Sequence, residues 1–312
     1  MASTFEQFVR FTTDAAGLER TFRLFQSIAQ ILSSYTLPFE TLLLFLSLST
    51  STAAAAANPA STHAVLVSLR GQLALARRYF RLFRFLESFQ AAQKLYLSLS
   101  STSTSTATAS AGGGRSLART ATWIDVFGRT FNGMYLLLEA SAILDAQKIP
   151  GLAVWGAELE PKVAFEGQRF WLFSLVCGVL AGLVRIAELS APASASSTVT
   201  TSADVDADEK RGSDGGMNEM ASEGVKGDER QGGQAQEEQR KRAAEARERR
   251  AKISGLRRRV VADALDITLP GSVVGWVPAS TGTVGLAMFV TTILTSIDIW
   301  ERCGREVAGS GK

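Results

Sequence analysis

The sequence contains very little of the material from which catalytic and metal sites are built. His63 is the single histidine, and Cys177 and Cys303 are the only cysteines in 312 residues. These numbers leave almost nothing for a metal site with histidine and cysteine ligands, a histidine-based catalytic triad or a disulfide framework. Phosphate-binding glycine loops, dinucleotide-binding fingerprints, nucleophile elbows and HExxH sequences are absent as well. We therefore expect no catalytic residues, no metal and no cofactor, and these absences argue against an enzyme.

Sorting signals and a strong charge imbalance are also missing. The opening MASTFEQFVR lacks the basic stretch and apolar core of a secretory signal, and the closing GSGK is not the peroxisomal Ser-Lys-Leu address. The formal net charge of +3 is too small to demand a nucleic-acid partner. Basic residues are concentrated in 240–259, with ten against two acidic ones. Because this run adjoins a candidate membrane segment, it favours attraction to acidic lipid over nucleic-acid binding.

Three low-complexity tracts divide the chain. Residues 47–63 and 98–116 are rich in Ser, Thr and Ala, and residues 190–250 contain no aromatic side chain. Such tracts have little apolar surface to bury and predict loops, frayed helix ends or linkers, although the last part of the third could form a basic helix. The expected regions are an N-terminal amphipathic helical region (1–97), a Ser/Thr/Gly-rich linker (98–118), a helical region with a first membrane segment (119–189), a disordered charged linker (190–250) and a C-terminal region with a second membrane segment (251–312).

Between these tracts apolar residues recur at helical spacing, and no stretch alternates convincingly as a strand does, which predicts an all-α fold. Thr13 or Asp14 can cap a helix that runs to about Ser34. Further helices are expected over about 64–97 and from about 123 to 148. The helix ending near Ser34 is amphipathic, and its two faces carry Leu18, Arg20, Phe22, Arg23 and Phe25.

Residues 77–96 combine a ridge of arginines with a broad apolar face. On a helix, Arg77, Arg81 and Arg84 fall on one narrow strip. This pattern is typical of a helix in a membrane interface, with guanidinium groups at anionic headgroups and apolar side chains in the acyl layer. A core helix of a soluble bundle has the same pattern, so this stretch alone leaves both interpretations open. The apolar face that would enter the acyl layer is carried by Leu82, Phe85, Leu86 and Phe89.

A first candidate for membrane insertion is the uncharged stretch 170–184, which with its flanks forms a segment over about 169–187. Gly178 and Gly182 within it form a Gly-x-x-x-Gly step, which allows two helices to approach closely in lipid. A buried helix of a soluble bundle is the alternative interpretation of this segment.

A second candidate lies in the uncharged stretch 267–297, where prolines interrupt the first part and leave a helix over about 280–300. Trp276 and Trp300 bracket that helix, as aromatic residues do at the two membrane–water interfaces. The sequence therefore predicts a helical membrane protein with amphipathic interfacial helices and one or two transmembrane helices. A soluble helical scaffold that buries all apolar segments is the competing class.

Four stretches, taken in order, resemble a known family. They are FVRFTTDAAGLERTFRLFQSIAQIL (8–32), ARRYFRLFRFLESFQAAQKLY (76–96), DVFGRTFNGMYLLLEASAIL (125–144) and DITLPGSVVGWVPASTGTVGLAMFVTTILTSIDIWERC (266–303). Together they resemble the peroxisomal biogenesis factor eleven family (the peroxin-eleven proteins), and its fungal branch in particular. The Ser/Thr/Ala insertions and the long charged linker depart from a compact family pattern.

The resemblance implies an integral, multi-pass protein of the peroxisomal membrane that promotes membrane elongation and tubulation before peroxisome fission. Amphipathic helices would insert into one leaflet, which assigns this role to 77–96 and, as a second candidate, to 14–34. The implied partners are acidic lipids of the peroxisomal membrane, further copies of this chain in a homo-oligomer, and the fission machinery with dynamin-related GTPases and their adaptors. The alternative function is a metabolite channel, because members of the family have been linked to small-solute permeability.

Two topologies are compatible with the sequence. The positive-inside rule keeps 240–259 in the cytosol and, if both segments span, places both termini in the lumen. The resemblance implies termini in the cytosol.

Overall fold

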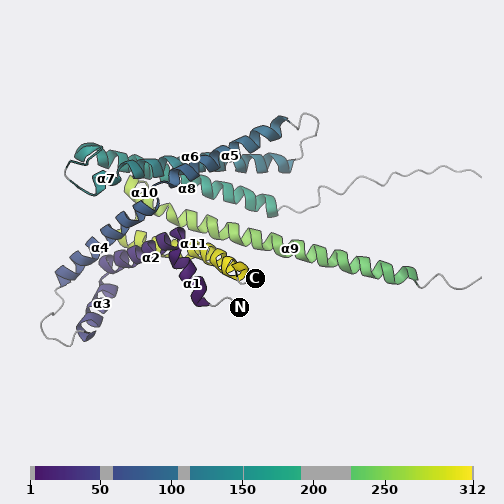
Figure 1. Cartoon of the computed structure of the whole chain (residues 1–312), viewed down its shortest axis with the longest axis horizontal. Coiled ribbons are helices and arrows are strands. Elements are labelled where there is room, and N and C mark those ends of the chain that lie inside the picture. Colours follow the sequence, from purple (N-terminus) through teal and green to yellow (C-terminus); the bar gives the residue numbers. More distant parts are fainter. Residues whose placement is uncertain (1–3, 50–58, 105–112, 150, 191–225, 311–312) are drawn as a thin grey trace, which may run out of the picture. The chain divides into compact units, whose positions relative to one another are not determined.

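The computed structural model describes residues 4–49, 59–104, 113–149, 151–190 and 226–310. These ranges form helices joined by turns and contain no strand (Figure 1), so the expected all-α class is confirmed. The helices are α1 (Thr4–Thr13), α2 (Ala15–Ser34), α3 (Thr36–Ser49), α4 (Pro59–Phe80), α5 (Arg84–Thr104), α6 (Gly113–Ser141), α7 (Ile143–Ala146), α8 (Gly156–Ser190), α9 (Lys226–Asp266), α10 (Thr268–Val274) and α11 (Thr281–Ser310).

The contacts of the chain divide it into two units. The main unit comprises residues 1–188 and 256–312, and the basic unit comprises residues 189–255. The charged linker expected over 190–250 falls largely in the basic unit. From 191 to 225 it lies outside the described residues, and from 226 onward the chain is helical.

Asp14 determines the start of α2, and an extended residue determines its end. The Asp14 carboxylate accepts a hydrogen bond from the backbone N–H of Gly17 at 3.1 Å, which confirms one of the two expected caps. Tyr35 is extended, with φ −119° and ψ 132°, and α2 meets the first part of α3 at an angle of 102°. Pro38 accounts for the break, because it lacks the N–H that would bond the carbonyl of residue 34 and is tolerated in the first turn of a new helix.

The single helix expected over about 64–97 is wrong, because a turn at residues 81–83 separates α4 from α5. Around this turn the N–H groups of Arg81, Leu82 and Arg84 bond to carbonyls three residues earlier, at 3.0 to 3.3 Å. This tighter pattern replaces the four-residue spacing of an α-helix. Arg77 before the turn pairs with Glu19 of α2, and Arg81 within the turn pairs with Glu139 of α6. Such long-range contacts override a local preference for one continuous helix.

Helices α5 and α6 pack side by side. A Cβ atom at Gly133 would lie 2.6 Å from Cε1 of Phe89, so the absence of a side chain makes room for the phenylalanine ring. Asn132 adds a hydrogen bond from its Nδ2 to the Oγ of Ser88 at 2.8 Å. Both helices extend into the stretch 98–118 that was expected to be a linker.

Among the described residues, two helices are long and apolar enough to cross a membrane. They are α8, and α11 between Thr281 and Gly309, and they contain the segments expected near 169–187 and 280–300. Helix α2 with the first part of α3 qualifies only as a bent pair. The expectation of a helical protein with one or two candidate transmembrane helices is confirmed.

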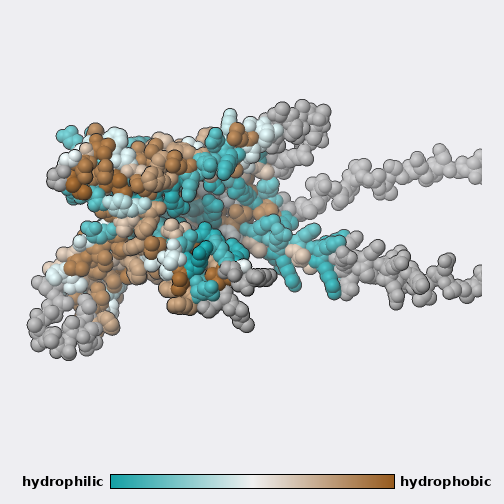
Figure 2. Space-filling view, viewed as in Figure 1, coloured by the Kyte–Doolittle hydropathy of each residue, from teal (hydrophilic) through white to brown (hydrophobic). Residues whose placement is uncertain are grey.

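The main unit buries several polar side chains beside its apolar core, and it exposes many large apolar ones. Glu19, Arg23 and Ser27 of α2 are buried, whereas Phe25 of the same helix is 54% exposed. Figure 2 shows apolar surface over the region of α2, α3 and α4. A soluble bundle hides its apolar faces from water, so this distribution argues against the soluble scaffold and is typical of a body surrounded by lipid.

Candidate functional site

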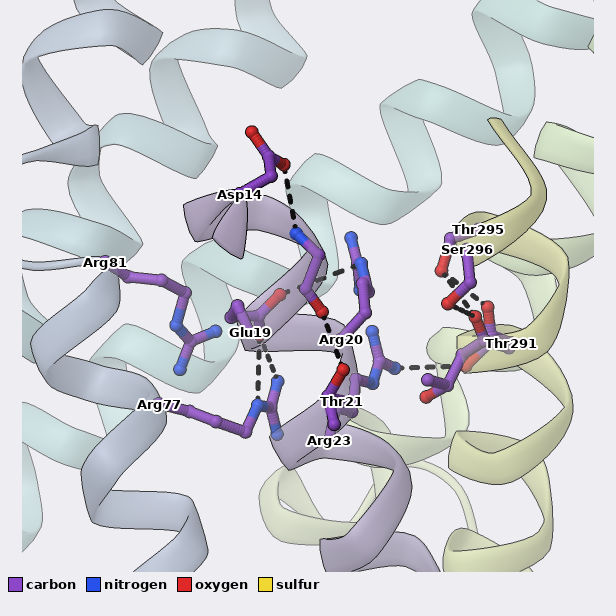
Figure 3. A network of polar contacts seen from close by, with 12 residues as sticks. Asp14, Glu19, Arg20, Thr21, Arg23, Arg77, Arg81, Thr291, Thr295 and Ser296 are labelled. Carbon is purple, nitrogen blue, oxygen red and sulfur yellow. Dashed lines mark hydrogen bonds and ion pairs between the residues drawn. The ribbon is translucent and has the colours of Figure 1, made fainter. Parts of the chain in front are cut away.

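One face of α2 carries the polar centre of the main unit. Glu19, Arg23, Ser27 and Gln30 follow one another at intervals of three or four residues, which places them on one side of the helix. Figure 3 shows α2 between the helix that carries Arg77 and α11 on the other side. The centre is thus assembled from segments far apart in the sequence.

Glu19 and Arg77 form the ion pair between α2 and α4. Arg77 donates from Nε and Nη2 to Glu19 Oε1, at 3.0 and 2.9 Å, and from Nη1 to Gln26 Oε1 at 2.7 Å. The Glu19 side chain is 4% exposed and also faces Arg20 at 3.7 Å. Burial lowers the pKa of Arg77 to about 10, which still leaves it charged at neutral pH. One buried carboxylate therefore serves two arginines.

Arg23 links α2 to the C-terminal part of the chain. It forms a buried ion pair with Asp266 at the end of α9 and donates from Nη2 to the hydroxyl of Thr291 in α11 at 3.0 Å. Charge-assisted hydrogen bonds of this kind are the strong ones, and here both partners are withdrawn from water. The pair ties together residues separated by more than two hundred positions in the chain.

Arg81 lies in the turn between α4 and α5 and binds to α6. Its Nη2 donates to Glu139 Oε1 at 2.7 Å, and its Nη1 donates to the hydroxyl of Tyr135 at 3.2 Å. The Tyr135 hydroxyl in turn donates to Glu139 Oε1 at 3.0 Å. Burial raises the pKa of Tyr135 to about 12, so this hydroxyl keeps its proton at neutral pH.

These charged groups surround a cavity of about 340 Å³ in the main unit. We call it the arginine cavity, because its lining includes Arg20, Arg23, Arg77, Arg81, Arg84 and Arg129. Its acidic lining residues are Glu19, Glu87, Asp263 and Asp266.

Asp263 is the acidic group with the most unfavourable surroundings. Burial raises its pKa to about 6, and only Arg259, at 3.8 Å, offsets this effect. Because the folded pKa exceeds the unfolded one, the folded state holds this proton more tightly, and the contribution of Asp263 to stability falls as pH rises from about 4 to 6.

Asp263→Asn should therefore raise the free energy of unfolding by about 1–3 kcal/mol at neutral pH and by little near pH 4. Denaturant unfolding in detergent at the two pH values measures this, and an equal gain at both would contradict it.

The structure places the sequence-predicted arginines in two settings. Arg77, Arg81 and Arg23 are engaged in the ion pairs described above, and Arg20 faces Glu19. Arg84 is the more accessible member of the ridge, with a side chain 45% exposed and Glu87 at 4.0 Å.

The apolar residues of the same segments differ in exposure. Leu86 is largely exposed, as is its neighbour Phe83, which is 69% exposed, and Phe25 of α2 is exposed too. Phe22 stacks on Phe80 at 5.5 Å between ring centroids. The partly covered members are Leu18, Phe22, Leu82, Phe85 and Phe89. Their contact with a membrane stays a prediction.

Gly178 and Gly182 do lie at a close approach of two helices, and the second helix belongs to this chain. A Cβ at Gly178 would lie 2.8 Å from Oδ2 of Asp263, and a Cβ at Gly182 would lie 2.3 Å from Cγ2 of Val260. The two tryptophans expected at the membrane–water interfaces have different surroundings. Trp276 is exposed beside Phe173, and the carbonyl of Trp300 accepts a hydrogen bond from Gln7.

Gly182→Ala should lower the free energy of unfolding by about 1–3 kcal/mol, because the added methyl group overlaps the side chain of Val260. Gly71→Ala in α4 is the matched control, since no atom lies within 4 Å of a Cβ placed there. The control should gain up to about 1 kcal/mol from helix propensity. Loss of the same size in both variants would show that the close approach to Val260 is unimportant.

Sequence reasoning missed the carboxylates that hold the arginines. Glu19, Glu139 and Asp266 pair with Arg77, Arg81 and Arg23 in the structure. The available signal was the spacing of Glu19 and Arg23, a polar strip at i and i+4 within an otherwise apolar helix. Among the described residues, no group of His, Cys, Asp or Glu is placed to hold a metal ion.

Comparison with known proteins gives a family match. A model of the family "Peroxisomal biogenesis factor 11 (PEX11)" matches residues 5–300, which is nearly the whole chain. No curated protein and no solved structure matches the sequence.

Proposed function

The chain belongs to the peroxisomal biogenesis factor 11 family of non-enzymatic peroxisomal membrane proteins that act in peroxisome biogenesis and proliferation, and from this premise we propose how it acts. We propose that it elongates and tubulates the peroxisomal membrane before fission, by inserting amphipathic helices into one leaflet and by self-association. As part of the same proposal we assign it to the fungal branch of the family. Its partners in this proposal are acidic membrane lipids, further copies of the chain, and dynamin-related GTPases with their adaptors.

The observation that supports the proposal is a pair of exposed apolar side chains at the turn between α4 and α5. Phe83 and Leu86 are 69% and 57% exposed, while Arg77 and Arg81 of the same stretch are held inside by carboxylates. Ion pairs to α2 and α6 therefore anchor a turn whose apolar side chains project outward. Such a turn can enter the acyl boundary as a wedge, because large apolar side chains bind there favourably.

In this proposal the accessible basic side chains provide the electrostatic attraction to lipid. Arg84 is the accessible arginine of the ridge, and each basic residue near an anionic surface contributes on the order of 1 kcal/mol. The basic unit adds a second set of such cations along α9, where residues 240–250 are mostly exposed.

Self-association requires a face other than Gly178 and Gly182, since α9 of the same chain covers both. Helix α8 offers such a face, because Val176, Leu180 and Leu183 lie at intervals of four and three residues and are exposed. Contacts between copies along this face would concentrate wedges, so that small local curvatures add.

The test is overexpression of the tagged full-length protein, scored for the length and number of peroxisomes. We expect elongated peroxisomes from the unchanged chain and near-normal ones from a Phe83→Ser/Leu86→Ser variant. Leu152→Ser/Val154→Ser is the control, because it removes two apolar side chains of similar exposure at another place. Elongation by the Phe83/Leu86 variant equal to that of the control would overturn the wedge.

A second candidate function is a channel for small solutes. The arginine cavity favours it, because a polar interior in an apolar exterior is what a conducting path requires. Discrete conductance of the purified protein in a planar bilayer would support this function, and its absence together with tubulation would exclude it.

The topology in this proposal places both termini in the cytosol. Two spans, α8 and α11, return the chain to the side from which it started. Protease treatment of intact peroxisomes should then remove tags at both ends, whereas protection of both tags would favour the lumenal alternative.

A further inference from the structure

The arginine cavity carries more positive charge than its own carboxylates neutralise. It is lined by six arginines and four acidic side chains. Glu139, which lies outside the lining, also pairs with Arg81 at 2.7 Å, and one positive charge remains when all eleven groups are ionised. Glu19 is shared between Arg77 and Arg20, and Arg84 has only the weak contact with Glu87 at 4.0 Å. Arg129 has no ion-pair partner among the described residues. The lining therefore carries fewer anionic than cationic side chains.

Hydrogen-bond donors in the same lining are also left without acceptors. The Nε atoms of Arg23 and Arg81 are buried and have no hydrogen-bond partner among the described residues. The Arg23 side chain is only 5% exposed, so water does not satisfy it freely. A buried donor without an acceptor carries the full desolvation penalty of that group. Both observations, charge and donors, point to the same missing component, an oxyanion.

The position of the cavity makes a bound anion still more favourable. Its walls include Trp171 and Leu175 of α8 and Thr295 of α11, the two helices long and apolar enough to cross a membrane. Charged groups at that depth are costly unless they are paired, because the low dielectric surroundings screen them poorly. A bound anion removes that cost, and a site of about 340 Å³ falls within the range of ligand sites in proteins.

We propose that the arginine cavity is a binding site for a phosphate group, held by the guanidinium groups of Arg20, Arg84 and Arg129 with the unpaired Nε atoms of Arg23 and Arg81 around it. Arginine matches the planar, multiple-acceptor geometry of phosphate better than any other side chain. The phosphate belongs either to a phospholipid headgroup that enters between the helices or to a soluble phosphate compound. This site shares Arg84 with the proposed lipid contact, and it does not depend on the insertion of Phe83 and Leu86 into the membrane.

Full-length protein purified in an uncharged detergent provides the test. One arm measures the thermal midpoint against inorganic phosphate, with chloride at equal ionic strength as reference. The other arm measures it in phosphatidylcholine bilayers with and without phosphatidylinositol. A midpoint raised by inorganic phosphate identifies a soluble phosphate, and one raised only by phosphatidylinositol identifies a headgroup; either result supports the site. No response in either arm overturns it.

Variants show whether phosphate binds in the arginine cavity. Arg129→Gln is the main variant, because Arg129 has no ion-pair partner among the described residues. Its loss therefore leaves no carboxylate without its cation. We expect phosphate binding about tenfold weaker in this variant, and further loss in Arg20→Gln/Arg129→Gln. Arg129→Lys should retain part of the response because it keeps the charge.

Arg10→Gln/Arg169→Gln is the matched control, since it removes two arginines with accessible side chains that pair outside the cavity. This control should respond to phosphate as the unchanged protein does. An equal response from the control and the Arg20/Arg129 variant would place binding elsewhere and overturn the proposal. Circular dichroism of each variant verifies that its helices are intact.

Discussion

Replacement of Glu19 by glutamine is expected to lower the free energy of unfolding by about 3–5 kcal/mol, among the largest effects of any single substitution in the main unit. The reason is the pair of arginines that this carboxylate serves. Without it Arg77, bonded at 2.9 and 3.0 Å, and Arg20 keep their charge in a buried site. Denaturant unfolding of the purified protein in detergent micelles measures the loss.

Two further variants show whether the effect is electrostatic. In Glu19→Gln/Arg77→Met the orphaned cation is removed as well, so part of the lost stability should return. Glu87→Gln removes an exposed carboxylate that lies 4.0 Å from Arg84, and its effect should stay within about 0.5 kcal/mol. A double variant no more stable than the single one would indicate that Glu19 acts by packing instead of charge.

Arg23→Met is expected to be comparably destabilising, by about 3–5 kcal/mol, because it leaves the Asp266 carboxylate buried without its cation. It also leaves the Thr291 hydroxyl without its donor from Arg23. Since this pair joins α2 to the end of α9 and to α11, we expect the C-terminal helices to loosen first. Limited proteolysis should therefore cut the variant near Asp266 before the unchanged protein is cut there.

Arg23→Met/Asp266→Leu is the informative companion, because it removes both charges and keeps apolar volume. Its stability should lie well above that of Arg23→Met alone. Arg10→Gln is the control, since its pair with Glu306 is accessible on both sides and should contribute no more than about 1 kcal/mol. Early cleavage in the control would show that any lost arginine exposes the C-terminal helices.

Much of the fold could be predicted because it depends on local signals. The cap at Asp14, the break before Pro38 and the uncharged runs inside α8 and α11 are all visible as residue types in a short window. Helical spacing and chain length against bilayer thickness are sufficient to interpret them. The order of such segments also carried the resemblance to the family, which the match over residues 5–300 bears out.

The break at 81–83 and the partners of the arginines could not be predicted in the same way. Arg81 leaves the regular helix to reach Glu139 and Tyr135, which lie more than fifty residues further along the chain. Nothing in the window around Arg81 distinguishes an arginine that contacts lipid from one that contacts a distant carboxylate. Gly178 and Gly182 present the same difficulty, since their spacing predicts a close helix contact but not which helix makes it.

The sequence by itself determined that this protein is helical, that two of its helices suit a membrane, and that 14–34 and 77–96 each have a charged and an apolar face. The tertiary structure decided which face of each helix points inward. An amphipathic pattern measures the difference between two faces and is the same whether water or lipid surrounds the helix. In the main unit the carboxylates of Glu19, Glu139 and Asp266 draw the arginines inward, and Phe25, Phe83 and Leu86 are left outside. Only the positions of those distant carboxylates settle that choice, because they supply the charge that makes a buried arginine stable.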